Sequence, residues 1–440
     1  MSDKRLASLK SGNQRGSILS AVASNTEITK PPGEKRLSRS AHAGHAGEVG
    51  SYSVYVATRP FASLDGLRAL SIAGVLWFHT TTDLPIWPAL RRGFLGVDFF
   101  FIISGFLIVT LLLRERRNTG TISLGNFYVR RSLRIFPAYW AMLLFVACVA
   151  YLKPGHESEG IKHDLPYSLL YISNLVPMAS LLSITWSLST EEQFYSIIPA
   201  LQKYTPRLFP MAILPVAYVM VSLPPFGIFQ NINLPGFFRQ TTFGPILLGV
   251  MLAFVLDHPR GWAVTASILR SPLSPLFALA LVVLALSCPG PDISGWPRLA
   301  IHGSLLVLLA SCVVREKHAL LPVLSWGPIR RFGVVSYGIY LYHLVVYWPA
   351  AKLLALLGVQ SQIALFLLVA AFSWLAAEFS YRFFEQRFLM LKRQFSSAGE
   401  TQLHPTDSTV AVAAAMLAQT SRDALGPPRT GARQTTPTQP

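Results

Sequence analysis

The residues with the clearest potential for chemistry lie in an otherwise apolar run, Leu64–Thr81. This run contains Arg68 near its start and His79 near its end. The eleven-residue spacing makes three helical turns plus about 20°, so both side chains would share a helix face about 16 Å apart. A charged side chain at mid-membrane depth costs about 3 kcal/mol and marks a functional site. Histidine titrates near neutral pH and is a common general base.

A second apolar run, Gly93–Leu113, carries Asp98 close to the end that would lie at the depth of His79. A carboxylate that bonds to the imidazole fixes its tautomer and raises its basicity. We therefore expect an Asp98–His79 pair across two antiparallel helices, with His79, Arg68 and Asp98 as catalytic residues. The alternative is an interfacial histidine capped by water, with Asp98 at a helix amino terminus.

Two further strings place polar side chains in apolar surroundings. Ser336, Tyr340 and His343 follow one another at i, i+4 and i+7, which puts them on one helix face. Glu191 lies in the string TWSLSTEEQFY. We expect these four residues to bind substrate or stabilise an oxyanion. The alternative is hydrogen-bonded packing between helices.

A basic cluster opens another apolar run. Arg130, Arg131 and Arg134 precede the string IFPAYW. Their planar guanidinium groups match phosphate oxygens, which predicts a phosphate-binding site. The alternative is a cytoplasmic anchor, because basic residues gather on that side of a membrane.

The composition restricts the class of protein. The chain has 440 residues, of which 52% are hydrophobic and 13% charged, and its net charge is +17. Soluble domains carry about 25% charged residues, and a nucleic-acid binder concentrates its basic residues on a polar face. We therefore predict an all-α, polytopic membrane protein whose partner is the lipid bilayer, with no nucleic acid and no metal site.

The apolar runs divide the chain into three parts. Residues 1–58 form a polar tail that we predict to be disordered, residues 59–390 a transmembrane domain, and residues 391–440 a low-complexity tail. Nine runs approach the length that crosses a membrane, and a tenth crossing must lie in Leu165–Leu201. The nine are Leu64–Thr81, Gly93–Leu113, Leu133–Leu152, Leu208–Leu223, Gly236–Leu256, Leu273–Cys288, Leu299–Val314, Phe332–Trp348 and Ile363–Phe384.

Charge asymmetry gives the orientation. With both termini in the cytoplasm and ten crossings, 30 of the 38 Lys and Arg residues fall on the cytoplasmic side. This agrees with the positive-inside rule. In the last run, Glu378 and Arg382 are four residues apart and are expected to pair with each other.

Taken together, these strings resemble the acyltransferase-3 family of integral membrane O-acyltransferases. The resemblance rests on SLDGLRAL, WFH, GFLGVDFFFIISGFLI, FYVRRSLRIFPAYW, TWSLSTEEQFY, SYGIYLYH and AEFSYRFFE, which cover most of residues 60–388 in the family's order. Arg68 and His79 match the family's active-site pattern. Arg130, Arg131 and Arg134 match its arginine motif, which implies a site for CoA phosphates. Many relatives carry a fused SGNH-type domain after the helices, where this sequence has about fifty low-complexity residues.

The resemblance implies transfer of an acyl group, expected to be acetyl, from acyl-CoA to a hydroxyl of a cell-envelope carbohydrate, a lipid-linked glycan or another exported acceptor. Acyl-CoA would be a substrate, with no tightly bound cofactor. His79 would act as general base or carry the acyl group itself. The bacterial inner membrane and a separate envelope-assembly partner are expected. The alternatives are a proton-coupled transporter of a small polar solute, which would also bury charged residues, and an inactive scaffold.

Overall fold

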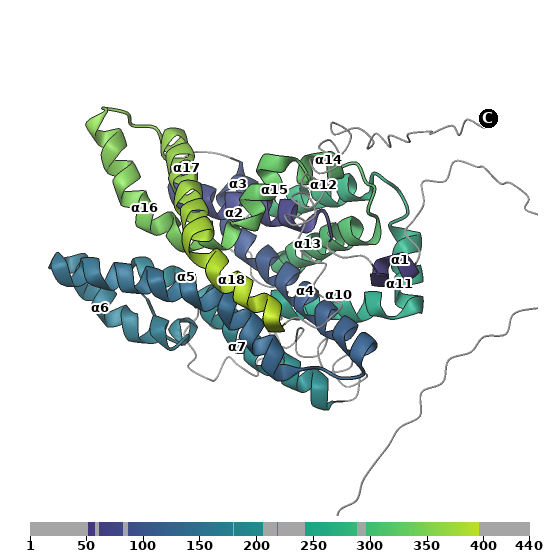
Figure 1. Ribbon diagram of the computed structural model, residues 1–440. Helices are drawn as coiled ribbons and strands as arrows, with labels where there is room; N and C mark the ends of the chain where they lie inside the picture. Colours follow the sequence, from purple (N-terminus) through teal and green to yellow (C-terminus); the bar gives the residue numbers. More distant parts are fainter. Residues whose placement is uncertain are drawn as a thin grey trace, which may run out of the picture. The chain divides into compact units, whose positions relative to one another are not determined.

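The computed structural model describes residues 52–57, 61–81, 87–178, 180–205, 218, 243–287 and 296–395. Every regular element within these ranges is helical, which confirms the all-α fold class. The helices in Figure 1 are α1 (Tyr52–Ala57), α2 (Leu64–Thr80), α3 (Pro88–Arg91), α4 (Gly96–Thr119), α5 (Leu124–Leu152), α6 (His156–Leu169), α7 (Thr185–Tyr204), α10 (Gly244–Asp257), α11 (Pro259–Ile268), α12 (Ser274–Leu286), α13 (Trp296–Val314), α14 (Leu321–Leu324), α15 (Gly327–Val334), α16 (Ser336–Leu356), α17 (Gln362–Ser380) and α18 (Gln386–Lys392).

Five helical stretches are long and apolar enough to cross a membrane. They are Gly93–Thr119, Leu124–Leu152, Trp296–Val314, Ser336–Leu356 and Gln362–Lys392. The pair α10 and α11 would add a sixth if it formed one span, but it bends by 104°. Apolar helices of this length are typical of an integral membrane protein. The count of ten crossings stays a prediction, because Leu208–Leu223 lies outside the described residues apart from Tyr218, and Gly236–Leu256 is described only from Phe243.

The structure corrects one expected boundary and shows which half of a second stretch, left open by the sequence, is a continuous helix. The run Phe332–Trp348 is not one helix, because α15 ends at Val334 and α16 begins at Ser336. In Leu165–Leu201, the continuous helix is α7, whereas the half before it breaks into two short 3₁₀ turns after α6 ends. Pro177 lies in this broken half and has no N–H to donate to a helix.

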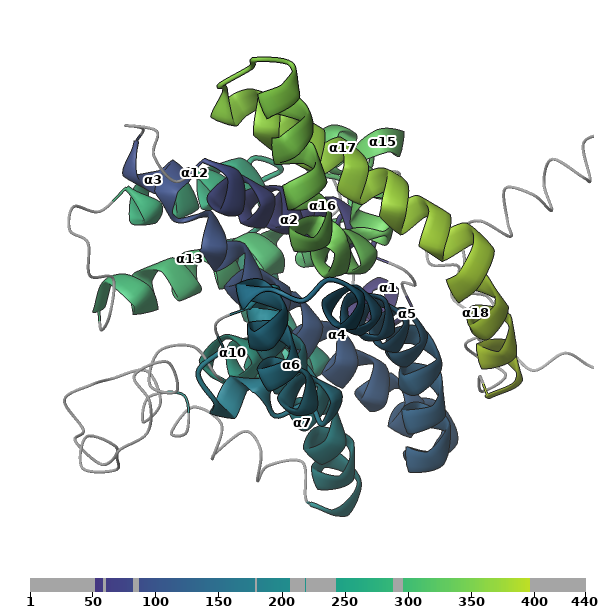
Figure 2. The ribbon, with the colours of Figure 1, turned by 90° about the vertical axis from the view of Figure 1, so that its left-hand side faces the viewer.

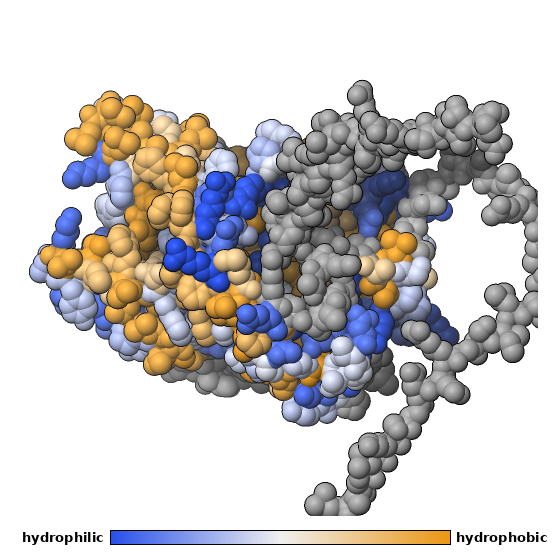
Figure 3. All heavy atoms as spheres, in the orientation of Figure 1, coloured by the Kyte–Doolittle hydropathy of each residue, from blue (hydrophilic) through white to orange (hydrophobic). Residues whose placement is uncertain are grey.

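The apolar surface of the outer helices is the part that lipid would cover. Leu152 of α5 is 81% exposed, Leu356 of α16 is 76% exposed and Phe379 of α17 is 66% exposed. Figure 3 shows apolar side chains gathered over α16, α17 and the end of α5. Soluble monomers rarely expose apolar patches of this extent, so these helices are suited to a hydrocarbon environment.

Close helix packing fixes the position of α4. A Cβ atom on Gly249 of α10 would lie 2.0 Å from the carbonyl oxygen of Ile102, and one on Gly105 of α4 would lie 2.2 Å from that of Ile246. Only glycine allows two backbones to approach this closely. Because α4 also carries Asp98, this crossing helps to fix the site described below.

The broken segment between α6 and α7 is held by side-chain hydrogen bonds. Tyr171 has a left-handed backbone conformation with φ of 53°, which is uncommon for a bulky residue. Its carbonyl oxygen accepts a hydrogen bond of 2.9 Å from Gln193 of α7, which also pairs with Asn174. Figure 2 shows α5, α6 and α7 side by side, and the three helices contact one another. The segment therefore forms a fixed wall next to α7.

Candidate active site

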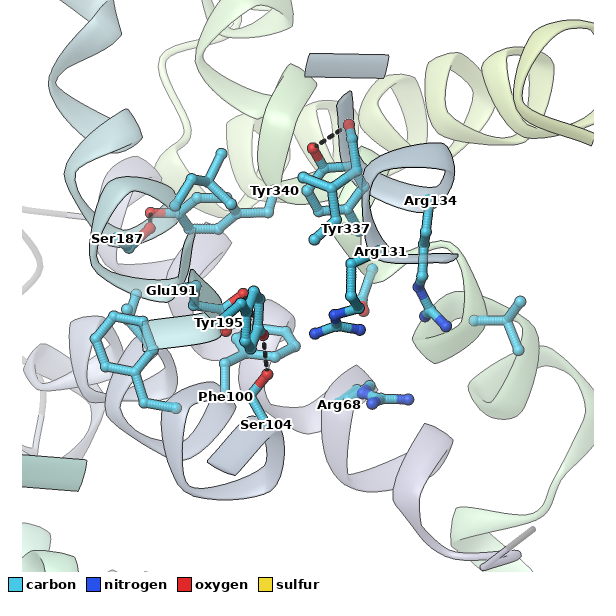
Figure 4. A pocket seen from close by; sticks show the side chains of 16 residues that line it. Arg68, Phe100, Ser104, Arg131, Arg134, Ser187, Glu191, Tyr195, Tyr337 and Tyr340 are labelled. Atoms are coloured by element: carbon cyan, nitrogen blue, oxygen red, sulfur yellow. Dashed lines mark hydrogen bonds between the residues drawn. The ribbon is translucent and has the colours of Figure 1, made fainter. Parts of the chain in front are cut away.

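Two adjoining cavities lie along α2. The first, which we call the basic cavity, has a volume of about 110 Å³. Figure 4 shows three guanidinium groups on one side of it, with a carboxylate and hydroxyl groups on the other. Its polar lining residues are Arg68, Ser104, Arg131, Arg134, Ser187, Glu191, Tyr195, Ser336, Tyr337 and Tyr340.

The basic cavity carries an excess of positive charge. Arg68, Arg131 and Arg134 line it, and Glu191 is the one carboxylate among its described lining residues. The guanidinium carbon of Arg131 lies 4.1 Å from the centre of the Tyr195 ring, and its Nε atom has no hydrogen-bond partner among the described residues. The Tyr195 hydroxyl donates to Glu191 at 2.9 Å. This arrangement is suited to an anionic ligand with several oxygen atoms.

Arg130 lies outside the basic cavity, which corrects the expectation that the three arginines act together. In helical phase Arg134 lies about 40° from Arg130 and about 60° from Arg131, so spacing alone does not separate the three side chains; their contacts do. The Nη2 atom of Arg130 lies 3.2 Å from Oε2 of Glu115, and its Nη1 donates to the carbonyl oxygen of Phe395 at 2.9 Å. Arg130 therefore joins α5 to α4 and to the segment after α18.

The second cavity, which we call the histidine cavity, is larger, at about 550 Å³. It shares Val97 and Tyr340 with the basic cavity. The Tyr340 hydroxyl donates to the carbonyl oxygen of Ile184 at 3.0 Å and lies 2.7 Å from the hydroxyl of Ser187. These bonds hold the tyrosine in the wall between the two cavities. The polar lining residues are His79, Asp98, Ser173, Asn174, Ser183, Arg298 and Tyr340.

A third cavity of about 780 Å³, which we call the α6 cavity, adjoins the histidine cavity. The two share His79 and Pro177. Polar and aromatic side chains of α6 and α16 line it, including His156, Glu157, Glu159, His163, Asp164, Tyr347 and Trp348. His79 therefore borders both cavities, while Arg68, on the same helix, lines the basic cavity.

The surroundings of His79 favour one neutral tautomer. Its Nδ1 atom lies 2.9 Å from the carbonyl oxygen of Val75. A carbonyl oxygen only accepts hydrogen bonds, so Nδ1 carries the proton and Nε2 keeps a free lone pair. The ring centre lies 4.9 Å from that of His343, whose Nδ1 atom is 2.6 Å from the carbonyl oxygen of Tyr340. His79 is therefore prepared to accept a proton at Nε2.

His343 does not line any of the three cavities. Its side chain is 1% exposed, and its Nε2 atom has no hydrogen-bond partner in the described part of the chain. The predicted role of His343 in substrate binding does not fit this position, because the ring packs against His79 instead. Glu191 and Ser336 line the basic cavity, not the cavity that contains His79.

Asp98 pairs with a different histidine from the one expected. Its Oδ2 atom lies 2.8 Å from Nη2 of Arg298 and 2.9 Å from Nε2 of His302. The expectation that Asp98 orients His79 is therefore wrong. The reason is tertiary: α13 brings two donors to the carboxylate, and the Val75 carbonyl oxygen already holds His79.

Arg298 is the site residue that sequence reasoning missed. It lies four residues before His302, so both side chains project from one face of α13 toward Asp98. This i, i+4 spacing of a cation and a histidine at the end of an apolar run was the available signal.

Comparison with known proteins gives the family. The sequence profile of the acyltransferase domain family known as acyltransferase-3 matches residues 61–378. The chain belongs to the acyltransferase-3 family. This match confirms the expected family resemblance, and the matched region contains the helices that line the basic cavity, α2, α4, α5, α7, α15 and α16.

Three relatives illustrate the similarity. The peptidoglycan O-acetyltransferase OatA of Listeria monocytogenes is 27% identical over 353 residues, which is 73% of this chain and 55% of that protein. YrhL of Bacillus subtilis, provisionally named a peptidoglycan O-acetyltransferase, is 31% identical over 65% of this chain and 48% of its own length. A Staphylococcus aureus (strain COL) protein, provisionally named an O-acetyltransferase, is 29% identical over 77% of this chain and 58% of its own length.

The chain thus spans about half the length of the relatives it matches. No solved structure gives a significant match.

Proposed function

We propose that this protein is a membrane-bound acyltransferase that transfers an acetyl group from acetyl-CoA to a hydroxyl of a cell-envelope carbohydrate or another exported acceptor. One observation carries the proposal. A single helix, α2, carries a residue of each cavity. Its Arg68 lines the basic cavity, which is rich in cations, and its His79, with a free Nε2 lone pair, lines the adjoining histidine cavity. The two are separated by the wall that contains Val97 and Tyr340.

The charge of the basic cavity supports CoA as the donor. Arg131 and Arg134 project from one face of α5, and Arg68 approaches from α2. Guanidinium groups bind phosphate oxygens through paired hydrogen bonds. With the CoA phosphates bound by these arginines, the pantetheine arm would extend toward the wall formed by Val97 and Tyr340. The names of the relatives support acetyl as the transferred group.

The position of His79 supports general base catalysis. In direct transfer, Nε2 of His79 takes the proton of the acceptor hydroxyl while the hydroxyl oxygen attacks the thioester carbonyl carbon. In the alternative route, Nε2 attacks the thioester first and carries the acetyl group to the acceptor. The acceptor would approach through the α6 cavity, whose polar and aromatic lining suits a hydroxylated ligand such as a sugar.

Membrane orientation is part of the proposal. Ten crossings with both termini in the cytoplasm would place Arg68, Arg131 and Arg134 toward the cytoplasm, where acetyl-CoA is made, and His79 toward the opposite face. The excess of basic residues in the segments expected to be cytoplasmic supports this orientation. The location that fits an exported carbohydrate acceptor is the bacterial inner membrane.

The test is acetyl transfer by purified protein in lipid nanodiscs, with ¹⁴C-acetyl-CoA and cell-envelope glycan from the source organism. Wild-type protein is expected to label the glycan and release free CoA. His79→Ala should lower kcat by a factor of roughly 10²–10⁴, the usual contribution of a general base. His258→Ala is the matched control, since His258 is exposed between α10 and α11 and lines none of the three cavities.

Two results would contradict the proposal. The first is wild-type activity in His79→Ala at matched protein levels. The second is a wild-type protein that does not bind acetyl-CoA yet moves a polar solute across the vesicle membrane, which would favour a transporter.

A further inference from the structure

Arg298 holds a partly buried positive charge at the edge of the histidine cavity. Its side chain is 13% exposed, and its Nη2 atom lies 2.8 Å from Oδ2 of Asp98. Its Nε atom is buried and has no hydrogen-bond partner among the described residues. A buried donor without a partner costs about 1–3 kcal/mol. Such a cost in a cavity lining indicates a partner that arrives with the ligand.

The partners of Arg298 restrict its movement. Asp98 is 2% exposed and accepts hydrogen bonds from both Arg298 and His302, so one carboxylate oxygen fixes two side chains of α13. The carboxylate also offsets the charge of Arg298, which lets a guanidinium group remain in a buried position. The guanidinium is therefore oriented before any ligand binds, as electrostatic catalysis requires.

The charge of the histidine cavity gives Arg298 a distinct role. Among the described residues that line this cavity, Arg298 is the only one with a permanent positive charge. Arg68, Arg131 and Arg134 line the basic cavity instead. A negative charge that develops on a substrate beside His79 thus has one permanent cation in the same cavity.

The geometry points to Arg298 as the residue that stabilises the oxyanion formed during acyl transfer. This inference rests on the proposed function. As the acceptor oxygen bonds to the thioester carbonyl carbon, its proton moves to Nε2 of His79 and the carbonyl electron pair moves onto oxygen. When that pair returns, the carbon–sulfur bond breaks, and the CoA sulfur leaves with the proton from His79. An acetyl-histidine route forms the same kind of oxyanion, which Arg298 stabilises in both cases.

The simplest variant, Arg298→Ala, also leaves Asp98 buried without its cation, and this can unfold the protein. The double variant Arg298→Ala/Asp98→Asn removes both charges, so no buried charge is left without its partner. Its activity can then be compared with that of wild type in a folded protein. In this double variant, kcat for acetyl transfer should fall by roughly 10²–10³-fold, the usual effect of losing one oxyanion donor. The KM for acetyl-CoA should change little, because the CoA phosphates bind in the basic cavity.

Two measurements distinguish a catalytic role of Arg298 from a purely structural one. Methylguanidine added to the double variant should restore part of the lost kcat, which a purely structural role would not allow. Arg92→Ala is the matched control, since Arg92 is also buried and donates to the Leu286 carbonyl oxygen at 2.9 Å but lines none of the three cavities. Its kcat should stay close to wild type.

The inference is overturned if the folded double variant turns over at the wild-type rate while His79→Ala remains inactive. It is also overturned if kcat falls but methylguanidine restores none of it. If instead His79→Ala retains wild-type activity, the proposed function itself fails.

Discussion

The basic cavity and the histidine cavity differ in charge balance, although they share a wall and both adjoin α2. In the basic cavity, three guanidinium groups face one carboxylate, and Nε of Arg131 has no partner among the described residues. In the histidine cavity, Asp98 offsets Arg298, and the Val75 carbonyl oxygen fixes the His79 tautomer that has a lone pair at Nε2. An excess of cations suits binding of an anion, whereas an imidazole with a free lone pair suits proton transfer. The difference indicates a division between donor binding and chemistry.

The largest effect on substrate affinity is expected in the basic cavity. Arg131→Ala/Arg134→Ala should weaken acetyl-CoA binding by roughly 10²-fold, because hydrogen bonds to charged groups contribute about 1.5–3 kcal/mol each. The rate at saturating acetyl-CoA should change far less. Equilibrium binding of ³H-acetyl-CoA in nanodiscs measures the affinity.

Arg130→Ala is the control for this double variant. It removes the ion-pair partner of Glu115 and should lower the thermal midpoint of unfolding, yet leave acetyl-CoA affinity unchanged. An equal loss of affinity in Arg130→Ala would show that the division of the arginine cluster is wrong.

A smaller effect, on kcat, is expected from His343, whose ring packs against His79. His343→Asn keeps a donor for the Tyr340 carbonyl oxygen but removes the ring that packs on His79. Loss of an aromatic contact of about 0.5–1.5 kcal/mol should lower kcat roughly 2- to 10-fold. Initial-rate kinetics that vary the acceptor test this role. A raised KM for the acceptor with unchanged kcat would instead make His343 a substrate-binding residue.

The smallest effect is on the pH dependence of stability and involves His318, which lines neither cavity. His318 follows α13 and bonds through Nε2 to the Ser63 hydroxyl at 2.8 Å, next to the start of α2. Burial, helped by nearby Arg315, lowers the pKa of His318 to about 4. In the unfolded chain, His318 binds a proton near pH 6.5. The contribution of neutral His318 to the free energy of unfolding is therefore complete above that pH and is lost as the pH falls toward 4.

Thermal unfolding between pH 7.5 and pH 4.5 measures the contribution of His318. The midpoint of His318→Gln, which keeps a hydrogen-bonding side chain, should fall less on acidification than that of wild type. Equal falls in both proteins would exclude His318 as the cause.

Features within one helix could be predicted from the sequence, because helical geometry determines them. The spacing of Arg68 and His79 predicted a shared helix, and the expected pair of Glu378 and Arg382 is confirmed at 2.5 Å. Asp98 was recognised as a buried carboxylate, but its partners come from α13, some 200 residues later. Local spacing carries no information on such a contact.

The arginine cluster shows the same limit. Arg134 lies about 40° from Arg130 and about 60° from Arg131 in helical phase, so the spacing does not say which of these arginines border a cavity. That depended on the partners of Arg130, which are Glu115 of α4 and the Phe395 carbonyl oxygen after α18.

The most direct test of the central claim measures binding and chemistry separately in two variants. Acetyl-CoA affinity and the single-turnover rate of acetyl transfer at saturating acetyl-CoA are compared for His79→Ala and Arg131→Ala/Arg134→Ala. The account predicts that His79→Ala loses the single-turnover rate with unchanged affinity, and that the arginine variant loses affinity while retaining most of the rate. Equal losses of affinity and rate in both variants would contradict the division between the two cavities.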